Sequence, residues 1–195
     1  MTEKQIARVR EKIKKIRAAL AAEKRMYGGY DDSRGLRYAP PELYLKIGDY
    51  SGALTYFRWF HKNFPDDVCY PEFLFIWTII LFKTGKIKDA EKKAIKTYFG
   101  NTYVFDKFFG NPIVPIDKYE YSNLDQPSYT EYFHLSSTQP ELAGFSEWLA
   151  VFIRSERFQQ LSSKFIALNI QLKTVQEYEK RRQLLTEIRM LENGG

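Results

Sequence analysis

The sequence is poor in the residues that build disulfides, metal sites and membrane spans. Its 195 residues include one cysteine, Cys69, and two histidines, His61 and His134. A single cysteine excludes a disulfide within the chain and is typical of a reducing compartment. The histidines lack the paired spacing of a zinc-binding helix, so we expect no metal site. The longest apolar run, residues 73–82, is too short to cross a bilayer, so we expect no membrane partner.

Catalytic and cofactor-binding patterns are also missing. The sequence contains no glycine-rich dinucleotide or phosphate-binding motif, and no histidine lies near Cys69 along the chain. The first residues are charged throughout, which is not the pattern of a secretory signal. We therefore expect a cytoplasmic protein that is not an enzyme, with no catalytic residues and no cofactor.

Helical periodicity is what the sequence does contain. From Tyr50 to His61, bulky apolar residues recur at steps of three and four, which places them on one helical face. Gly48 precedes this run and suits the left-handed conformation that ends a helix, whereas Pro65 stops the run. These features predict two helices joined by a tight turn. We expect the first of them to begin near residues 40–41, since proline is tolerated at the start of a helix.

The same pattern returns 37 residues later. A glycine followed five positions on by an alanine occurs in both copies, and the first copy adds a phenylalanine and a closing proline. The residues that define this repeat are Gly48, Ala53, Phe57, Pro65, Gly85 and Ala90. The pattern resembles the tetratricopeptide repeat family, whose helix pairs recur at about 34 residues. The resemblance covers residues 34–110, with a degenerate third copy after residue 100, and it implies antiparallel helix hairpins that bind proteins or peptides.

The resemblance also implies a partner-binding groove. The segment from residue 71 to 82 is apolar on nearly every side, which is typical of a helix buried on every side. The groove residues that the resemblance implies are Glu42, Glu72, Phe75, Ile79, Phe82 and Lys83. Either another part of this chain covers the apolar ones, most simply the N-terminal or the C-terminal helix, or a helix or peptide of a partner does.

Positive charge is concentrated in residues 1–26. This segment holds nine lysines and arginines against three glutamates, and the remaining residues carry equal numbers of each sign, so the net charge of +6 resides here. Its apolar residues recur at helical spacing and predict an amphipathic helix with a narrow seam: Ile6, Val9, Ile13, Ile16 and Leu20. We expect the seam to dock on the body and leave a basic face in water, which includes Lys4, Arg8, Lys12 and Lys15. A basic arm for nucleic acid, or self-association through the seam, is the alternative.

The remaining segments are less regular. Residues 111–153 predict a long loop followed by a helix pair, and residues 154–195 predict one long C-terminal helix. Beyond Thr174 that helix is highly charged with a thin apolar seam, which is typical of pairing with a partner helix, so a homodimer through it is expected if the chain self-associates. A polar cluster precedes the first repeat, and its members are expected to pair with one another: Asp31, Asp32, Arg34, Arg37 and Glu42.

The sequence therefore predicts an all-α protein. Two tetratricopeptide-like hairpins and a degenerate third would be flanked by an N-terminal amphipathic helix and a long C-terminal helix. The function that this pattern favours is a non-enzymatic protein–protein interaction module that binds a helix or peptide of a partner. The alternative is a nucleic-acid-associated protein that uses the basic N-terminal helix.

Overall fold

The computed structural model describes residues 1–30 and 35–194, and the side chains up to residue 192. Within these ranges the chain forms helices and no strand, which confirms the all-α prediction. Short 3-10 segments interrupt the chain at η1 (Leu36–Tyr38), η2 (Asn123–Asp125), η3 (Pro127–Tyr132) and η4 (Pro140–Leu142). The α-helices are α1 (Glu3–Tyr27), α2 (Ala39–Lys46), α3 (Tyr50–Asn63), α4 (Pro71–Lys83), α5 (Ile87–Gly100), α6 (Val104–Phe109), α7 (Ala143–Ile153), α8 (Glu156–Thr174) and α9 (Tyr178–Gly194).

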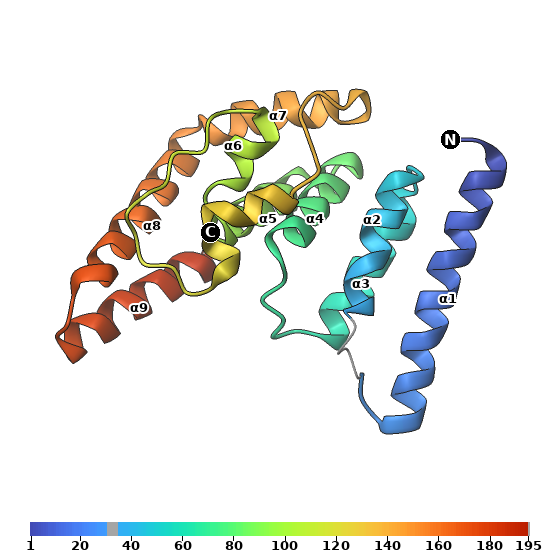
Figure 1. Ribbon diagram of the computed structural model, residues 1–195, viewed down its shortest axis with the longest axis horizontal. Helices are drawn as coiled ribbons and strands as arrows, with labels where there is room; N and C mark the ends of the chain where they lie inside the picture. Colours follow the sequence, from blue (N-terminus) through green and yellow to red (C-terminus); the bar gives the residue numbers. More distant parts are fainter. Residues whose placement is uncertain (31–34, 195) are drawn as a thin grey trace.

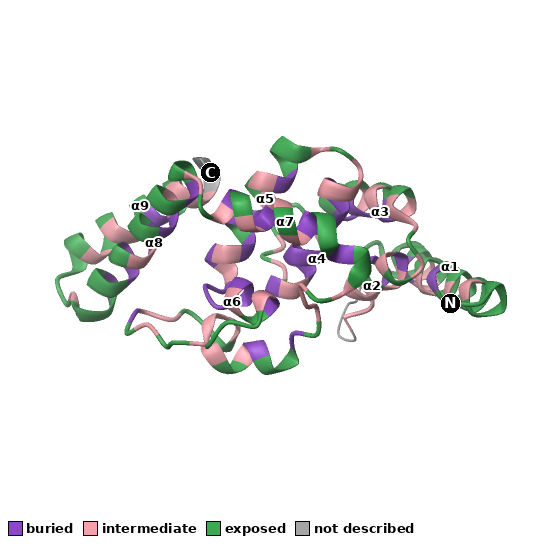
Figure 2. Ribbon diagram, turned by 90° about the horizontal axis from the view of Figure 1, so that it is seen from above, coloured by how far each residue is buried: buried purple, intermediate pink, exposed green. Residues whose placement is uncertain are grey.

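The helices follow one another along the molecule. Helix α1 forms one end, α2 to α5 follow, and α8 and α9 form the other end (Figure 1). Buried residues concentrate around α4, α5 and α7, whereas α1 and the far tips of α8 and α9 are largely exposed (Figure 2). No helix in the described part of the chain combines the length and the apolar character that a membrane crossing requires.

Two turns 37 residues apart share one geometry. Gly48 ends α2 with a φ of 68°, and Gly85 follows α4 with a φ of 71°, a conformation that costs other residues energy. In each turn the N–H of the residue after the glycine donates to a carbonyl five residues back, at 3.0 Å and 2.9 Å respectively. Helix α2 then packs on α3, and α4 on α5. Ala53 in α3 and Ala90 in α5 are fully buried. Their small side chains allow the paired helices to approach closely.

The apolar face of α4 is covered by the chain itself. Phe75 has no exposed surface, and its ring lies 4.9 Å from that of Phe108 in α6, 5.1 Å from that of Phe133 and 5.5 Å from that of Phe145 in α7. Ile79 is equally buried. The predicted groove is therefore closed, and neither the N-terminal nor the C-terminal helix closes it. The segment after α6 places Phe133 against α4, and α7 adds Phe145 and Trp148 to the same face.

The C-terminal segment is two helices, not the single long helix that the sequence predicts. The chain leaves the helical conformation at Val175, with φ −70° and ψ 127°, and α9 folds back on α8 (Figure 1). Ile188 is 3% exposed in this arrangement. The Arg181 guanidinium steadies the turn, since Nη1 donates to the carbonyl of Leu172 at 3.0 Å. Folding back buries Ile188 and partly buries Leu185 and Leu191 of the predicted seam, whereas Tyr178 stays exposed.

Helix α1 docks by its apolar seam. Thr2 and Gln5 form a capping box at its start, and Ile13 and Leu20 are buried, at 4% and 0% exposure. The helix contacts α2 and η1, so it covers the first hairpin and not the α4 face. Docking on one narrow seam leaves the polar sides of α1 accessible, and this placement creates the candidate site.

Candidate functional site

A cleft follows α1 where this helix meets the first hairpin. It has two sections, of about 380 Å³ and about 800 Å³, and the side chain of Arg17 lines both of them. We call the two sections together the α1 cleft. The first section is lined by Arg10, Ile13, Lys14, Arg17, Tyr44 and Asp49. The second section adds Ala18, Ala21, Lys24 and Arg25 from α1, with Tyr30, Trp59, Lys62 and Asn63 opposite.

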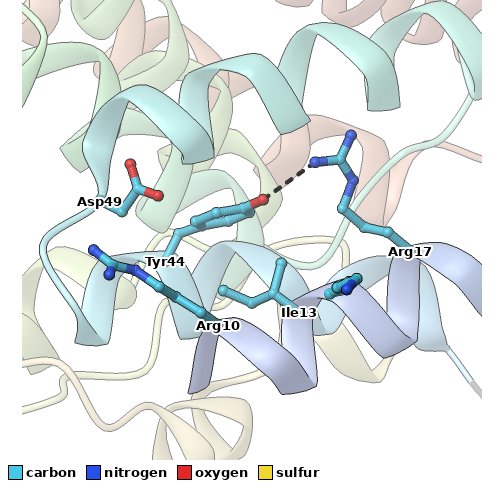
Figure 3. A pocket seen from close by; sticks show the side chains of 6 residues that line it. Arg10, Ile13, Arg17, Tyr44 and Asp49 are labelled. Carbon is cyan, nitrogen blue, oxygen red and sulfur yellow. Dashed lines mark hydrogen bonds between the residues drawn. The ribbon is translucent and has the colours of Figure 1, made fainter. Parts of the chain in front are cut away.

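The first section is built around Tyr44. This residue lies in α2, and its hydroxyl accepts a hydrogen bond from Arg17 Nη1 at 3.5 Å (Figure 3). Ile13 packs beside it, and Arg10 lies at the Asp49 end (Figure 3). The Asp49 carboxylate caps α3, because Oδ1 accepts from the backbone N–H of Gly52 at 2.9 Å. The acidic side chain of this section is therefore already engaged in the fold.

The second section is organised by Tyr30 and Asn63. Oδ1 of Asn63 accepts from the Tyr30 hydroxyl at 3.0 Å and from Lys24 Nζ at 2.9 Å, and its amide nitrogen donates to the Trp59 carbonyl at 2.7 Å. The Tyr30 and Trp59 rings meet edge to face with centroids 5.6 Å apart. These contacts hold the aromatic wall in place, so a partner would meet a preorganised surface.

The α1 wall of the cleft is a stripe at helical spacing. Arg10, Lys14, Arg17, Ala21 and Lys24 recur at steps of four and three, so they lie along one side of the helix. The sequence reasoning missed this stripe. The sequence did contain a signal for it, because these residues all lie beside the apolar seam of α1, on the same side of it. What made the stripe a cleft was the position of α2 and α3, which periodicity within α1 does not reveal.

The basic residues chosen from the sequence lie on another side of α1. Lys4, Arg8, Lys12 and Lys15 are all exposed, and none of them lines either section of the cleft. The structure therefore divides the positive charge of α1 into two sets. One set points into solvent and the other faces the first hairpin.

The α1 cleft is strongly positive. Among the described residues, six cationic side chains and the carboxylate of Asp49 line it, and the cations are Arg10, Lys14, Arg17, Lys24, Arg25 and Lys62. Cations gathered in a concave surface raise the local potential and attract anions. Between them lie the apolar surfaces of Ala18, Ala21 and Trp59. The arrangement suits recognition of a ligand that is both acidic and apolar, and the described lining residues place no nucleophile beside a base.

The residues of the predicted groove do not form an open site. Phe75 and Ile79 are core residues, and Phe82 packs against Phe145 and Trp148. Lys83 Nζ donates to the carbonyl of Glu141 at 2.6 Å, so it tethers α4 to the segment before α7.

The two acidic residues of that predicted groove differ in exposure. Glu42 is exposed on α2 and Glu72 is half-buried at the start of α4. Burial, with a smaller contribution from the charge of Glu42, raises the pKa of Glu72. Glu72 lies in the first turn of α4, where the helix dipole favours negative charge.

A half-buried polar cluster joins η1 to the connection between α3 and α4. Arg37 forms an ion pair with Asp67 at 2.9 Å, the Tyr38 hydroxyl donates to Asp67 at 2.7 Å, and the Cys69 N–H donates to it at 2.8 Å. Burial alone would raise the pKa of Asp67, but the hydrogen bonds from Tyr38 and Cys69 and the Arg37 charge outweigh it, so this pKa is lowered. Arg37 thus pairs with a residue outside the polar cluster expected from the sequence. Three members of that expected cluster, Asp31, Asp32 and Arg34, lie outside the described residues.

Other reactive groups in the described structure are not arranged for chemistry. Burial raises the pKa of the Cys69 thiol to about 12, so at neutral pH the thiolate nucleophile is scarce. Within residues 1–30 and 35–194, no three histidine, cysteine, aspartate or glutamate side chains gather as metal ligands would.

Compared with known proteins, the chain matches no protein-family model, no curated sequence and no solved structure.

Proposed function

We propose that this chain is a non-enzymatic interaction module that binds a segment of a partner protein in the α1 cleft. The observation that carries the proposal is the composition of that cleft, in which six cationic side chains surround an apolar strip formed by Ala18, Ala21 and Trp59. Protein-binding surfaces combine aromatic and arginine side chains in this way, because the aromatic groups supply apolar area and the cations supply orientation.

A tetratricopeptide-like arrangement of the hairpins is part of the proposal. The shared turn geometry at Gly48 and Gly85 supports it, as do the buried alanines five residues after each glycine. The closure of the α4 face moves the binding role from the predicted groove to the α1 cleft. A cytoplasmic location completes the proposal and rests on the single cysteine, Cys69.

The proposal is tested by filling the cleft. Ala21 is exposed in the second section, so Ala21→Trp places a large ring in the cleft without disturbing the core. The matched control is Ala167→Trp, which makes the same change at an exposed position of α8. Tagged wild-type protein and both variants are used to capture proteins from extracts of the native host. We expect a partner that binds the wild type and Ala167→Trp and is lost with Ala21→Trp. Equal capture by all three proteins would contradict the proposal.

Nucleic acid is the second candidate ligand. It is favoured by the exposure of Lys4, Arg8, Lys12 and Lys15 on the outer side of α1. Four phosphate contacts would make the logarithm of the affinity fall with the logarithm of salt concentration with a slope of about −3 to −4. Binding of an oligonucleotide with that slope, weakened by Arg8→Glu combined with Lys12→Glu and unaffected by Ala21→Trp, would favour this candidate over the first.

A further inference from the structure

We infer that the occupant of the α1 cleft is an acidic, amphipathic helix of a partner protein. The inference rests on the proposed function, because it names the chemistry of the partner that the same cleft would bind. Three independent features of the cleft carry it, namely its charge, the spacing of that charge along α1, and the apolar strip at its centre.

Charge specifies an anionic partner. The described lining residues of the cleft supply six cations and one carboxylate, and that carboxylate, of Asp49, accepts a hydrogen bond from the backbone at the start of α3. A neutral or basic segment would leave these cations close together without counter-charge. An acidic segment neutralises them and is drawn toward the cleft before contact.

Spacing specifies a helix. The cations at Arg10, Lys14, Arg17 and Lys24 lie along one side of α1, and from residue 10 to residue 25 the helix rises about 22 Å. A second helix laid alongside α1 repeats its side chains with the same pitch of about 5.4 Å, so carboxylates spaced by three and four residues meet successive cations. An extended strand repeats its same-face side chains about every 6.7 Å and falls out of register.

The centre of the cleft specifies an apolar anchor. Ala18 and Ala21 leave space between the cations, and Trp59 and Tyr30 form the facing wall. One large aliphatic or aromatic side chain of the partner fits there between its acidic neighbours. The Trp59 ring packs against Tyr56, Tyr30 and Phe64, with centroid distances of 5.1, 5.6 and 5.8 Å, so this wall is held in place. An apolar anchor flanked by carboxylates is a pattern that an amphipathic protein helix presents.

The probe is a fluorescein-labelled synthetic peptide of about 16 residues, long enough for a helix of about 24 Å. Glutamates at steps of four and three residues lie on one face, flanking a central leucine and phenylalanine, with alanine and glutamine elsewhere. The first control is a peptide of the same composition in scrambled order, and the second is a single-stranded oligonucleotide of the same charge. Binding to the full chain is measured by fluorescence anisotropy at low and at physiological salt.

A matched pair of variants locates the binding. Arg10→Glu with Lys14→Glu reverses two charges in the cleft, and Arg8→Glu with Lys12→Glu reverses the same two residue types, at the same spacing, on the outer side of α1. We expect the patterned peptide to bind at least about tenfold more tightly than the scrambled one. The cleft variant should lose about tenfold in affinity and the outer variant at most about threefold, because distant charges are screened at physiological salt. Circular dichroism at 222 nm verifies that both variants are folded.

Four outcomes would overturn the inference. Equal affinity for the patterned and scrambled peptides would show that helical register is not recognised. Equal losses in the two variants would show that the net charge of α1 attracts the peptide and that the cleft does not. Tighter binding of the oligonucleotide than of the patterned peptide would assign the surface to nucleic acid. If the peptide fails while host-protein capture still depends on Ala21, the partner chemistry is wrong and the proposed function stands.

Discussion

Replacing Phe75 with alanine tests whether the α4 face is closed, as in the structure, or forms an open groove. In the structure the Phe75 side chain is fully buried, and its ring meets the rings of Phe105, Phe108, Phe133 and Phe145 at centroid distances of 6.0, 4.9, 5.1 and 5.5 Å. These four rings come from α6, α7 and the end of η3, so one substitution removes an anchor for all three segments. In an open groove the same side chain would lie in water.

The expected loss of stability is large. Removing a buried phenylalanine side chain costs about 3–5 kcal/mol, because the transfer free energy of the ring is lost and a cavity remains. For a chain of 150–250 residues, each kcal/mol lowers the melting temperature by about 2–4 °C. Phe75→Ala should therefore melt about 6–20 °C below the wild type. Conservative replacement by leucine should restore part of the difference, because it refills part of the cavity.

The assay is thermal unfolding followed by circular dichroism at 222 nm. Val151→Ala is the control, because Val151 lies on α7 with 72% of its surface exposed and should shift stability by less than about 0.5 kcal/mol. A melting temperature for Phe75→Ala within 2 °C of the wild type, about the shift that a single kcal/mol produces, would refute the packing of α6 and α7 on α4. It would also return the predicted groove to consideration as the binding site.

Three further substitutions test other parts of the fold. Ala53→Leu should cost about 1–3 kcal/mol in urea unfolding, because Ala53 has no exposed surface between packed helices, and an unchanged midpoint would argue against the tight crossing. Asp67→Asn should destabilise the protein at pH 7 by about 1–3 kcal/mol. Because the pKa of Asp67 is lowered, its ionised form stabilises the fold at any pH above its unfolded-state pKa of about 3.9, and this stability is lost as the pH falls through the folded-state pKa. The difference in unfolding free energy between Asp67→Asn and the wild type should therefore narrow below about pH 4. A difference that stays constant with pH would contradict the ion-pair account. Ile188→Asp should detach α9 from α8 and make it an early site of limited proteolysis, whereas a protease-resistant variant would show that α9 does not depend on this contact.

The features that the sequence predicted correctly depend on local signals. Gly48 and Gly85 mark their turns because a positive φ favours glycine whatever surrounds it. The seam of α1 is readable because all of its members lie on one helix, and Ile13 and Leu20 are buried as the spacing predicts. Such signals require no knowledge of the rest of the chain.

The features that were missed depend on contacts between distant segments. Nothing near Phe75 indicates that α7, about 70 residues later, will cover it, because any apolar helix of suitable length satisfies the same face. The break at Val175 carries neither glycine nor proline, so the local pattern predicts a continuous helix. The stripe from Arg10 to Lys24 becomes a cleft only because α2 brings Tyr44 and α3 brings Trp59 opposite.

The most direct test of the central claim is site-specific photo-crosslinking in the native host. A benzophenone amino acid is placed at position 21, inside the second section of the α1 cleft, at position 12, on the outer side of α1, or at position 167 on α8. These three exposed positions differ in the surface that they report. The account predicts a discrete crosslinked partner protein from position 21 and none from positions 12 and 167. Crosslinks from position 12 or 167 with none from position 21 would contradict it.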